Sequence, residues 1–137
     1  MAYDPNNIFA KILRGELPSV KVFEDDHSLA FMDIMPATEG HTLVIPKEKA
    51  ETIFDLSADG AAYLIGATKI VAAAVKKAFG CPGVMLAQLN GAAAGQTVPH
   101  IHFHVLPRSQ ANFSLHGRSM VDPKMLEPIA ARIRASL

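Results

Sequence analysis

The chain has 137 residues and half of them are hydrophobic, so it is long enough to build one domain with a buried core, and we expect residues 1–137 to form that single domain. Its 13 acidic and 13 basic side chains balance to a formal net charge of zero. This balance argues against nucleic acid or an anionic membrane surface as a partner, because both attract strongly basic proteins.

The first predicted helix begins with Asp4 as its cap and Pro5 as its first residue, and Gly15 can end it in the left-handed conformation. Turn-forming residues then separate three short strands. We expect these strands at residues 20–23, 29–32 and 42–45, with Pro46 ending the third.

A longer helix is predicted between Ser57 as its cap and Gly80 as its end, and its small residues fit packing on its own sheet or against a second subunit. Two further strands, 83–90 and 99–106, flank a loop rich in Gly and Ala. A last helix could begin at Asp122-Pro123, but Pro128 predicts a kink or a later start. The order of elements predicts an α+β domain with an antiparallel sheet of about five strands.

Several features bear on location. The one cysteine, Cys81, cannot form an internal disulfide, which favours a reducing compartment. The N-terminus lacks the pattern of a signal peptide. The apolar stretch around residues 61–75 contains Gly66 and Lys69 and looks too short and too interrupted to cross a bilayer. We therefore expect a cytoplasmic protein without a membrane partner.

Three histidines alternate along the last predicted strand: His100, His102 and His104. Alternate residues of a strand share a face, so the three imidazoles are expected to form a row. The apolar residues between and after them should point to the core: Ile101, Phe103 and Val105.

Such a row has three readings. Two histidines at i and i+2 can chelate a metal ion, with His41 or Asp33 as a further ligand. Alternatively, a neutral imidazole can attack phosphorus while its neighbours stabilise the developing charge, and the middle histidine is then the natural nucleophile. The third reading is a set of strand histidines with no chemical task.

The loop before the histidines favours the phosphoryl reading. Its glycines, Gly91 and Gly95, permit close approach of backbone N–H groups to an anion, and Gln96 and Thr97 add side-chain donors. The loop contains no acidic residue, which disfavours a metal. The alternative is a plain flexible hairpin loop.

The chain resembles a known family at this point. Residues 100–106 follow the pattern His-φ-His-φ-His-φ-φ, where φ is apolar. The segments that carry the resemblance span about residues 6–108: NIFAKILRGELPS, VFEDDHSLAFMDI, HTLVIPK and NGAAAGQTVPHIHFHVLPR. They are similar to the nucleoside phosphoramidase branch of the histidine-triad (HIT) proteins. The resemblance implies a HIT-like fold and a homodimer with joined sheets and the 57–79 helices at the junction, and it implies no cofactor and no metal.

The resemblance also implies catalytic roles. His102 would attack the α-phosphorus and form a nucleotidyl-histidine that water then hydrolyses. His104 and His41 match histidines that contact the phosphate and position protons, and His100 matches the supporting first histidine. We predict that a backbone carbonyl near His100 or the loop holds the second ring nitrogen of His102.

The remaining matched positions concern the nucleotide. Asp33 matches the acid that binds ribose hydroxyls. Loop positions match contacts to the phosphate and leaving group: Asn90, Gly95, Gln96 and Thr97. Apolar positions match the walls of the base pocket: Ile8, Phe9, Ile12, Phe31 and Ile34.

The implied reaction is hydrolysis of a phosphoramidate, or a related conjugate, of a purine nucleoside monophosphate such as AMP or GMP. A dinucleoside polyphosphate hydrolase and a nucleotide-binding regulatory protein with little turnover remain alternatives. Asn7 and Ala10 stand where some bacterial members carry a Cys-x-x-Cys zinc motif, so no such zinc is expected. His27 and His116 lie outside the motifs, and we expect both at the surface, with approach of the His116 loop to substrate as the alternative.

Overall fold

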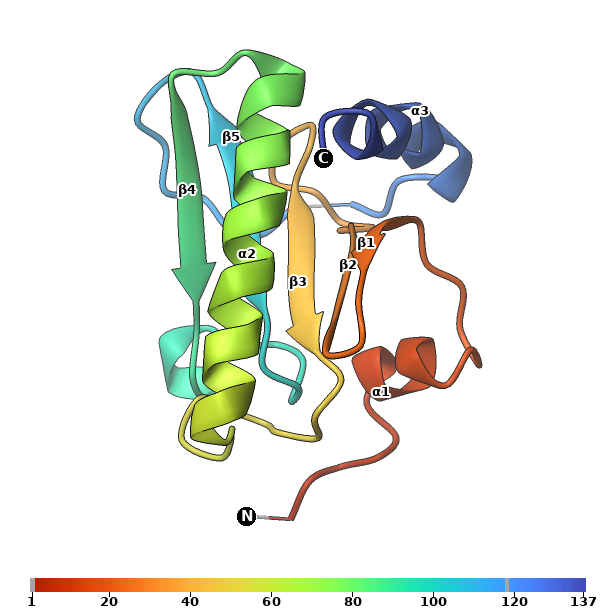
Figure 1. Cartoon of the computed structure of the whole chain (residues 1–137), viewed down its shortest axis with the longest axis vertical. Coiled ribbons are helices and arrows are strands. Elements are labelled where there is room, and N and C mark those ends of the chain that lie inside the picture. The colour runs from red at the N-terminus through yellow and green to blue at the C-terminus, as the bar shows by residue number, and fades with distance from the viewer. Residues whose placement is uncertain (1, 118) are drawn as a thin grey trace.

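The computed structural model describes residues 2–117 and 119–137, and an antiparallel sheet forms its centre (Figure 1). The strand order is β1-β2-β3-β5-β4, and every neighbouring pair is antiparallel. The strands are β1 (Lys21–Glu24), β2 (Ser28–Met32), β3 (Thr42–Pro46), β4 (Gly83–Gln88) and β5 (Phe103–Arg108). The predicted α+β class with a five-stranded antiparallel sheet is therefore confirmed.

Helix α2 (Ala58–Phe79) lies across one face of the sheet (Figure 1). The Ser57 hydroxyl accepts a hydrogen bond from the Gly60 N–H, and Gly80 ends the helix at φ +57°, as predicted. By length and composition α2 could cross a membrane, so the prediction that this stretch is too short was wrong. In this fold, however, Leu64 and Val71 are buried against the sheet, as expected for a core helix.

Helix α1 (Ile8–Leu13) packs on the opposite face, where Phe9 joins a second apolar cluster with residues of β2 and β3. The cap is Asn7, whose side chain accepts from the Ala10 N–H, so the predicted start at Asp4 was wrong. Asp4 instead forms a turn by accepting from the Asn6 N–H. Gly15 follows the helix at φ +78°, as predicted.

Strand β5 begins at Phe103, four residues later than predicted. Before that point the chain leaves the sheet, and the Ile101 N–H donates to the Ala50 carbonyl. Ile101 and Val105 face the α2 side, as predicted. His104 is paired with Leu43 and therefore shares the α1 face, where it is as buried as the apolar core.

Helix α3 (Pro123–Arg134) begins directly after its cap, Asp122, with Pro128 in its interior. The later start predicted from Pro128 was wrong. Pro128 removes the N–H that would pair with the Lys124 carbonyl, and both residues are solvent-exposed, so water can satisfy that carbonyl.

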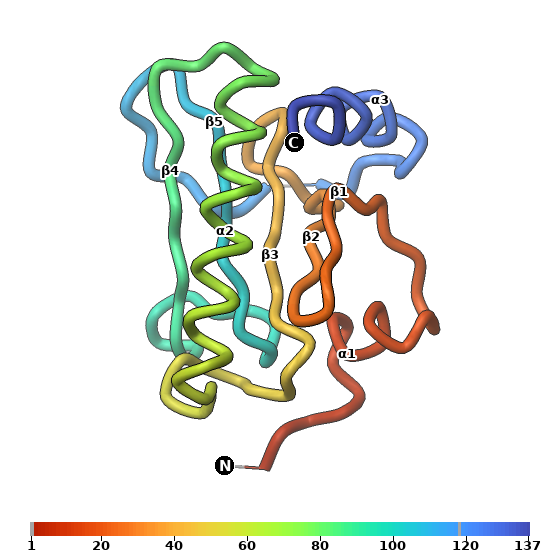
Figure 2. Tube along the Cα trace, viewed as in Figure 1, coloured from red at the N-terminus to blue at the C-terminus, as the bar shows by residue number. Residues whose placement is uncertain are grey.

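The segment between β5 and α3 crosses the sheet from the β4 side and passes the end of β2 (Figure 2). It is attached there by two backbone hydrogen bonds, from the Gly117 N–H to the Met35 carbonyl (3.2 Å) and from the Val121 N–H to the Ile34 carbonyl (2.8 Å). These bonds place part of the C-terminal region beside the α1 face of the sheet.

Candidate active site

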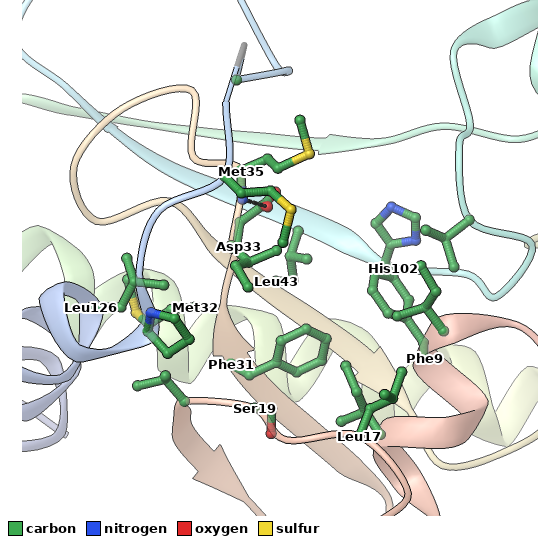
Figure 3. A pocket seen from close by; sticks show the side chains of 18 of the residues that line it. Phe9, Leu17, Ser19, Phe31, Met32, Asp33, Met35, Leu43, His102 and Leu126 are labelled. Atoms are coloured by element: carbon green, nitrogen blue, oxygen red, sulfur yellow. Dashed lines mark hydrogen bonds between the residues drawn. The ribbon is translucent and has the colours of Figure 1, made fainter.

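A cavity of about 650 Å³ opens on the α1 face of the sheet. Figure 3 shows His102 and Phe9 together on one side of it, Met32 and Leu126 on the other, and Asp33 between them. The predicted residues that line it are Ile8, Phe9, Ile12, Phe31, Asp33, Ile34, Thr97, His102 and His104. The predicted residues that lie behind or beside this lining are His41, His100, Asn90, Gly95 and Gln96.

His102 is held in one orientation and one tautomer. Its Nδ1 lies 2.7 Å from the His100 carbonyl oxygen. Because a carbonyl only accepts, Nδ1 carries the ring hydrogen and Nε2 keeps its lone pair. The predicted backbone carbonyl is therefore confirmed. The Phe9 ring packs edge-on against the imidazole at 4.9 Å between centroids, which further restricts the ring.

His104 is oriented through His41. The His41 Nδ1 accepts from the Ala37 N–H at 3.0 Å, so its Nε2 carries the hydrogen and donates to the His104 Nδ1 at 2.9 Å. The remaining hydrogen of His104 is thus on Nε2 and can be donated in the cavity. His41 itself is fully buried and positions His104, whereas the resemblance had implied a contact with phosphate.

His100 is held by hydrogen bonds on both of its ring nitrogens. Its Nε2 donates to the Pro46 carbonyl at 2.8 Å, and its Nδ1 accepts from the Tyr3 hydroxyl at 2.6 Å. Tyr3 was missed by the sequence reasoning, because it precedes every motif and reaches His100 only through the folded chain. Both ring nitrogens of His100 are paired, so this residue has a structural role in the site.

Burial keeps these imidazoles neutral. Loss of hydration lowers the pKa of His41 to about 3 and the pKa values of His100 and His104 to about 4. It also lowers the pKa of His102, although the hydrogen bond to the His100 carbonyl opposes this effect. At neutral pH the site therefore offers a neutral nucleophile at His102 and a neutral hydrogen-bond donor at His104.

Asp33 is the acidic group of the cavity. Its Oδ1 accepts from the Met35 N–H at 2.8 Å, the bond drawn in Figure 3, and burial raises its pKa to about 6. Ligand atoms of Asp33, His41 and His104 lie within 4.8 Å of one another, which is close enough for a divalent metal. A metal would have to replace the hydrogen between His41 and His104, so the hydrogen-bonded arrangement and the metal exclude each other.

Gln96 holds the loop before the histidines together. Its side-chain nitrogen donates to the carbonyls of Glu51 (2.7 Å) and Val98 (2.9 Å), and its oxygen accepts from the Gly91 N–H (2.7 Å). The amide that the sequence predicted as a phosphate donor is therefore engaged with backbone in this conformation.

Of the other predicted loop residues, two bond within the protein and one lines the cavity. The Asn90 side chain accepts from the Ile53 N–H at 2.8 Å, and the Gly95 N–H bonds to the Ala92 carbonyl at 3.0 Å within the short helix η1 (Ala92–Ala94). Gly95 has φ +99°, which favours glycine over residues with a side chain. Thr97 is the predicted loop residue that reaches the cavity lining.

A third histidine lines the same cavity. His116 is solvent-exposed, as predicted, but it also lines the cavity, with its ring 6.2 Å from that of His104. His116 lies outside the motifs, and its approach to the cavity was the less favoured reading of its loop. Further lining residues that the sequence did not single out are mostly apolar, including Leu17, Val20, Met32, Met35 and Leu126, with Ser19 as a polar one.

Several known proteins are similar to this chain. A family model described as the HIT domain matches residues 14–111. The adenosine 5′-monophosphoramidase hnt1 of Schizosaccharomyces pombe is 42% identical over 108 residues, covering 79% of this chain and 78% of that protein. The adenylylsulfatase HINT3 of Arabidopsis thaliana is 34% identical over 135 residues, covering 95% of this chain and 68% of that protein.

The structural similarity extends along the whole chain. The crystal structure of a Hit-like protein involved in cell-cycle regulation from Bartonella henselae, with an unknown ligand, matches with a TM-score of 0.94. The two sequences are 47% identical, and the match covers 100% of both chains. The family match, the two relatives and this shared fold lead to one conclusion: the chain belongs to the HIT domain family.

Proposed function

We propose that this protein hydrolyses a phosphoramidate, or a related conjugate, of a purine nucleoside monophosphate at the α-phosphorus. The observation that carries the proposal is the fixed tautomer of His102, whose Nδ1 is held by a backbone carbonyl while Nε2 keeps its lone pair at the cavity. Relatives named as an adenosine 5′-monophosphoramidase and an adenylylsulfatase support the same class of reaction.

The chemistry proceeds in two displacements. The His102 Nε2 attacks phosphorus, a phosphorus–nitrogen bond forms, and the bond to the leaving group breaks. Water then attacks the nucleotidyl-histidine and releases the monophosphate. His104, 5.0 Å from His102 between ring centroids, donates its Nε2 hydrogen to the phosphate oxygens that gain charge, and the Thr97 hydroxyl is a second donor.

The apolar side of the cavity suits a nucleoside. Phe9 and Phe31 pack edge to face, with their centroids 5.4 Å apart, and present an aromatic wall for a base. Aliphatic side chains of Ile8, Ile12 and Ile34 line the same cavity. Asp33 lines the same cavity, where its carboxylate can accept hydrogen bonds from ribose hydroxyls.

A turnover assay tests the proposal. Purified protein is incubated with adenosine 5′-monophosphoramidate or with diadenosine tetraphosphate, and His102→Ala serves as the background control. We expect release of AMP from the phosphoramidate, with kcat/KM at least about tenfold higher than for the tetraphosphate. Nucleotide binding without turnover would instead support the regulatory alternative, and a preference for the tetraphosphate would support the polyphosphate hydrolase.

We further propose that the protein is a homodimer. Strand β4 is an edge of the sheet, and Leu86 on it is 44% exposed. Large apolar side chains beside α2 are also exposed, including Phe54 at 86% and Ile65 at 51%. An unpaired edge next to an apolar patch is a typical surface for self-association.

The dimer can be tested by sedimentation. Leu86→Lys should shift the equilibrium towards monomer, because it places a charge on the proposed joint between the sheets. Met125→Lys is the matched control, since Met125 is an exposed apolar residue (68%) on α3. A monomeric wild-type protein at micromolar concentration would contradict the proposal.

A further inference from the structure

The segment after β5 is held so that His116 has a defined place. The Gly117 N–H bonds to the Met35 carbonyl, and the Val121 N–H bonds to the Ile34 carbonyl. A Cβ atom on Gly117 would lie 2.4 Å from the carbonyl oxygens of Met35 and Pro36, so only glycine permits this close approach. The attachment point is therefore directly adjacent to His116 in the chain.

His116 lies between the histidine row and the loop. Its ring is perpendicular to that of His104 at 6.2 Å between centroids. Its Nε2 lies 4.0 Å from the position that a Cβ atom on Gly95 would occupy. The cavity that it lines is the one lined by His102 and Thr97. His116 thus faces the space in which the proposed phosphorus chemistry takes place.

That chemistry requires a proton that the buried histidines do not supply. Breaking a phosphorus–nitrogen bond releases an amine, and an amine leaves only if its nitrogen is protonated. His102 attacks through the nitrogen that carries no hydrogen, and burial keeps His41, His100 and His104 neutral. His116 also lines the cavity but is exposed to solvent, and an imidazole can serve as a general acid and base between water and substrate.

We propose that His116 is a catalytic residue that serves the leaving group, an inference that depends on the proposed function above. As the bond between His102 and phosphorus forms, protonated His116 transfers its proton to the leaving nitrogen, and the phosphorus–nitrogen bond of the substrate breaks. Neutral His116 then takes a proton from the water that attacks the nucleotidyl-histidine. The cycle returns both histidines to their starting states.

The groups that face His116 come from three elements. His102 and His104 belong to β5 and the residues before it, His41 lies at the start of β3, and Asp33 follows β2. The histidines are neutral, and Asp33 is the acidic group among them. Asp33 and His116 line the same cavity, and the nearby cation is Arg108, whose guanidinium donates to the Ser114 carbonyl two residues before His116.

Two substrates with the same nucleotide separate proton donation from binding. An alkyl phosphoramidate of AMP needs a proton on its leaving nitrogen, whereas the p-nitrophenyl ester of AMP releases a stable anion without one. His116→Gln can donate a hydrogen bond but cannot transfer a proton. His27→Gln is the matched control, because His27 is an exposed histidine that stacks on Tyr63 outside the cavity.

We expect His116→Gln to lower kcat/KM for the phosphoramidate about 10²-fold and to change that for the ester less than about threefold. His27→Gln should leave both unchanged. Unchanged phosphoramidate hydrolysis by His116→Gln, or equal losses with both substrates, would overturn the role of His116 while leaving the proposed function intact. A wild-type protein that cleaves neither substrate would overturn both proposals.

Discussion

The two faces of strands β3 and β5 are equally buried but chemically opposite. On the α2 side, Val44 and Val105 are inaccessible to water and belong to the main apolar cluster. On the α1 side, His104 sits opposite Leu43 in the same sheet and is 4% exposed. The same backbone therefore carries a face that stabilises the fold and a face whose burial must be offset by hydrogen bonds.

The comparison shows what burial does for an imidazole. Each buried histidine of the site gives at least one ring nitrogen to a fixed partner: a backbone carbonyl for His100 and His102, and the His41–His104 contact for the other two. These bonds decide which nitrogen carries the hydrogen. Removal from water keeps the rings neutral. The hydrogen bonds set the orientation of the rings, and burial sets their protonation state.

The largest expected effect is a loss of activity from a substitution on the α1 side, in contrast to a loss of stability from one on the α2 side. His102→Ala should reduce kcat/KM by about 10⁴-fold or more while leaving the free energy of unfolding unchanged or higher, because it removes the nucleophile and a buried polar ring. Val44→Ala should do the reverse, costing about 2 kcal/mol of stability with kcat retained. Steady-state kinetics and urea unfolding of both variants check this, and a stability loss confined to His102→Ala would contradict it.

Acid should destabilise the protein through the histidine face. The folded-state pKa values of His41, His100 and His104 lie at about 3 to 4, below the ordinary value of 6.5. Their stabilising contribution is therefore complete above pH 6.5 and is lost as pH falls towards 4, at up to about 1.4 kcal/mol per pH unit for each. Urea unfolding at several pH values measures this loss, and constant stability down to pH 5 would argue against neutral buried rings.

Asp33 changes the pH dependence of stability in the opposite direction. Its pKa is raised to about 6, so its contribution to stability is present at low pH and is lost as pH rises through 6. Asp33→Asn keeps an acceptor for the Met35 N–H and should steepen the acid-induced loss of stability relative to wild type. A shallower curve for this variant would show that the carboxyl is not buried as described.

A smaller effect tests the contact that orients His104. His41→Leu removes the hydrogen donated to the His104 Nδ1 and should lower kcat about 10²-fold with little change in KM. His41→Gln carries a terminal N–H₂ group that can replace the imidazole donor, so it should recover part of the loss. Equal activity of the two variants would contradict a positioning role for His41.

The smallest expected effect is that of metal removal. His41 and His104 use on each other the nitrogens that a metal would need, so dialysis against a chelator should leave kcat unchanged. Activity that disappears with the chelator and returns with a stoichiometric divalent metal would favour the metal site of Asp33, His41 and His104 instead.

Local signals explain which elements the sequence could predict. Helix α2 has a serine cap, a stripe of apolar residues and a glycine end, all readable within the segment itself. The start of α1 was predicted at Asp4, but Asn7, three residues later, forms the capping bond. Before β5, the Ile101 N–H bonds to the Ala50 carbonyl, which is distant in the sequence. No local pattern reveals this contact.

The same distinction between local signals and distant contacts applies to the site. The alternation of the histidines predicted that His102 and His104 lie side by side, whereas His100 lies outside the cavity lining; the need to fix His102 predicted its carbonyl partner. The engagement of Gln96 with the Glu51 carbonyl and the arrival of His116 at the cavity both depend on segments brought together only by folding. Sequence reasoning therefore identified residues that line the cavity and missed groups whose partners or placement come from distant segments.

The central claim is that His102 bonds covalently to phosphorus, and a trapped intermediate tests it most directly. The reaction with an adenosine phosphoramidate is quenched at alkaline pH during the first turnover, and the peptide that spans the three histidines is fragmented by mass spectrometry. The account predicts an adduct of nucleotide mass on His102 that is absent from His102→Ala. An adduct on His100, His104 or His116, or rapid turnover with no adduct, would contradict it.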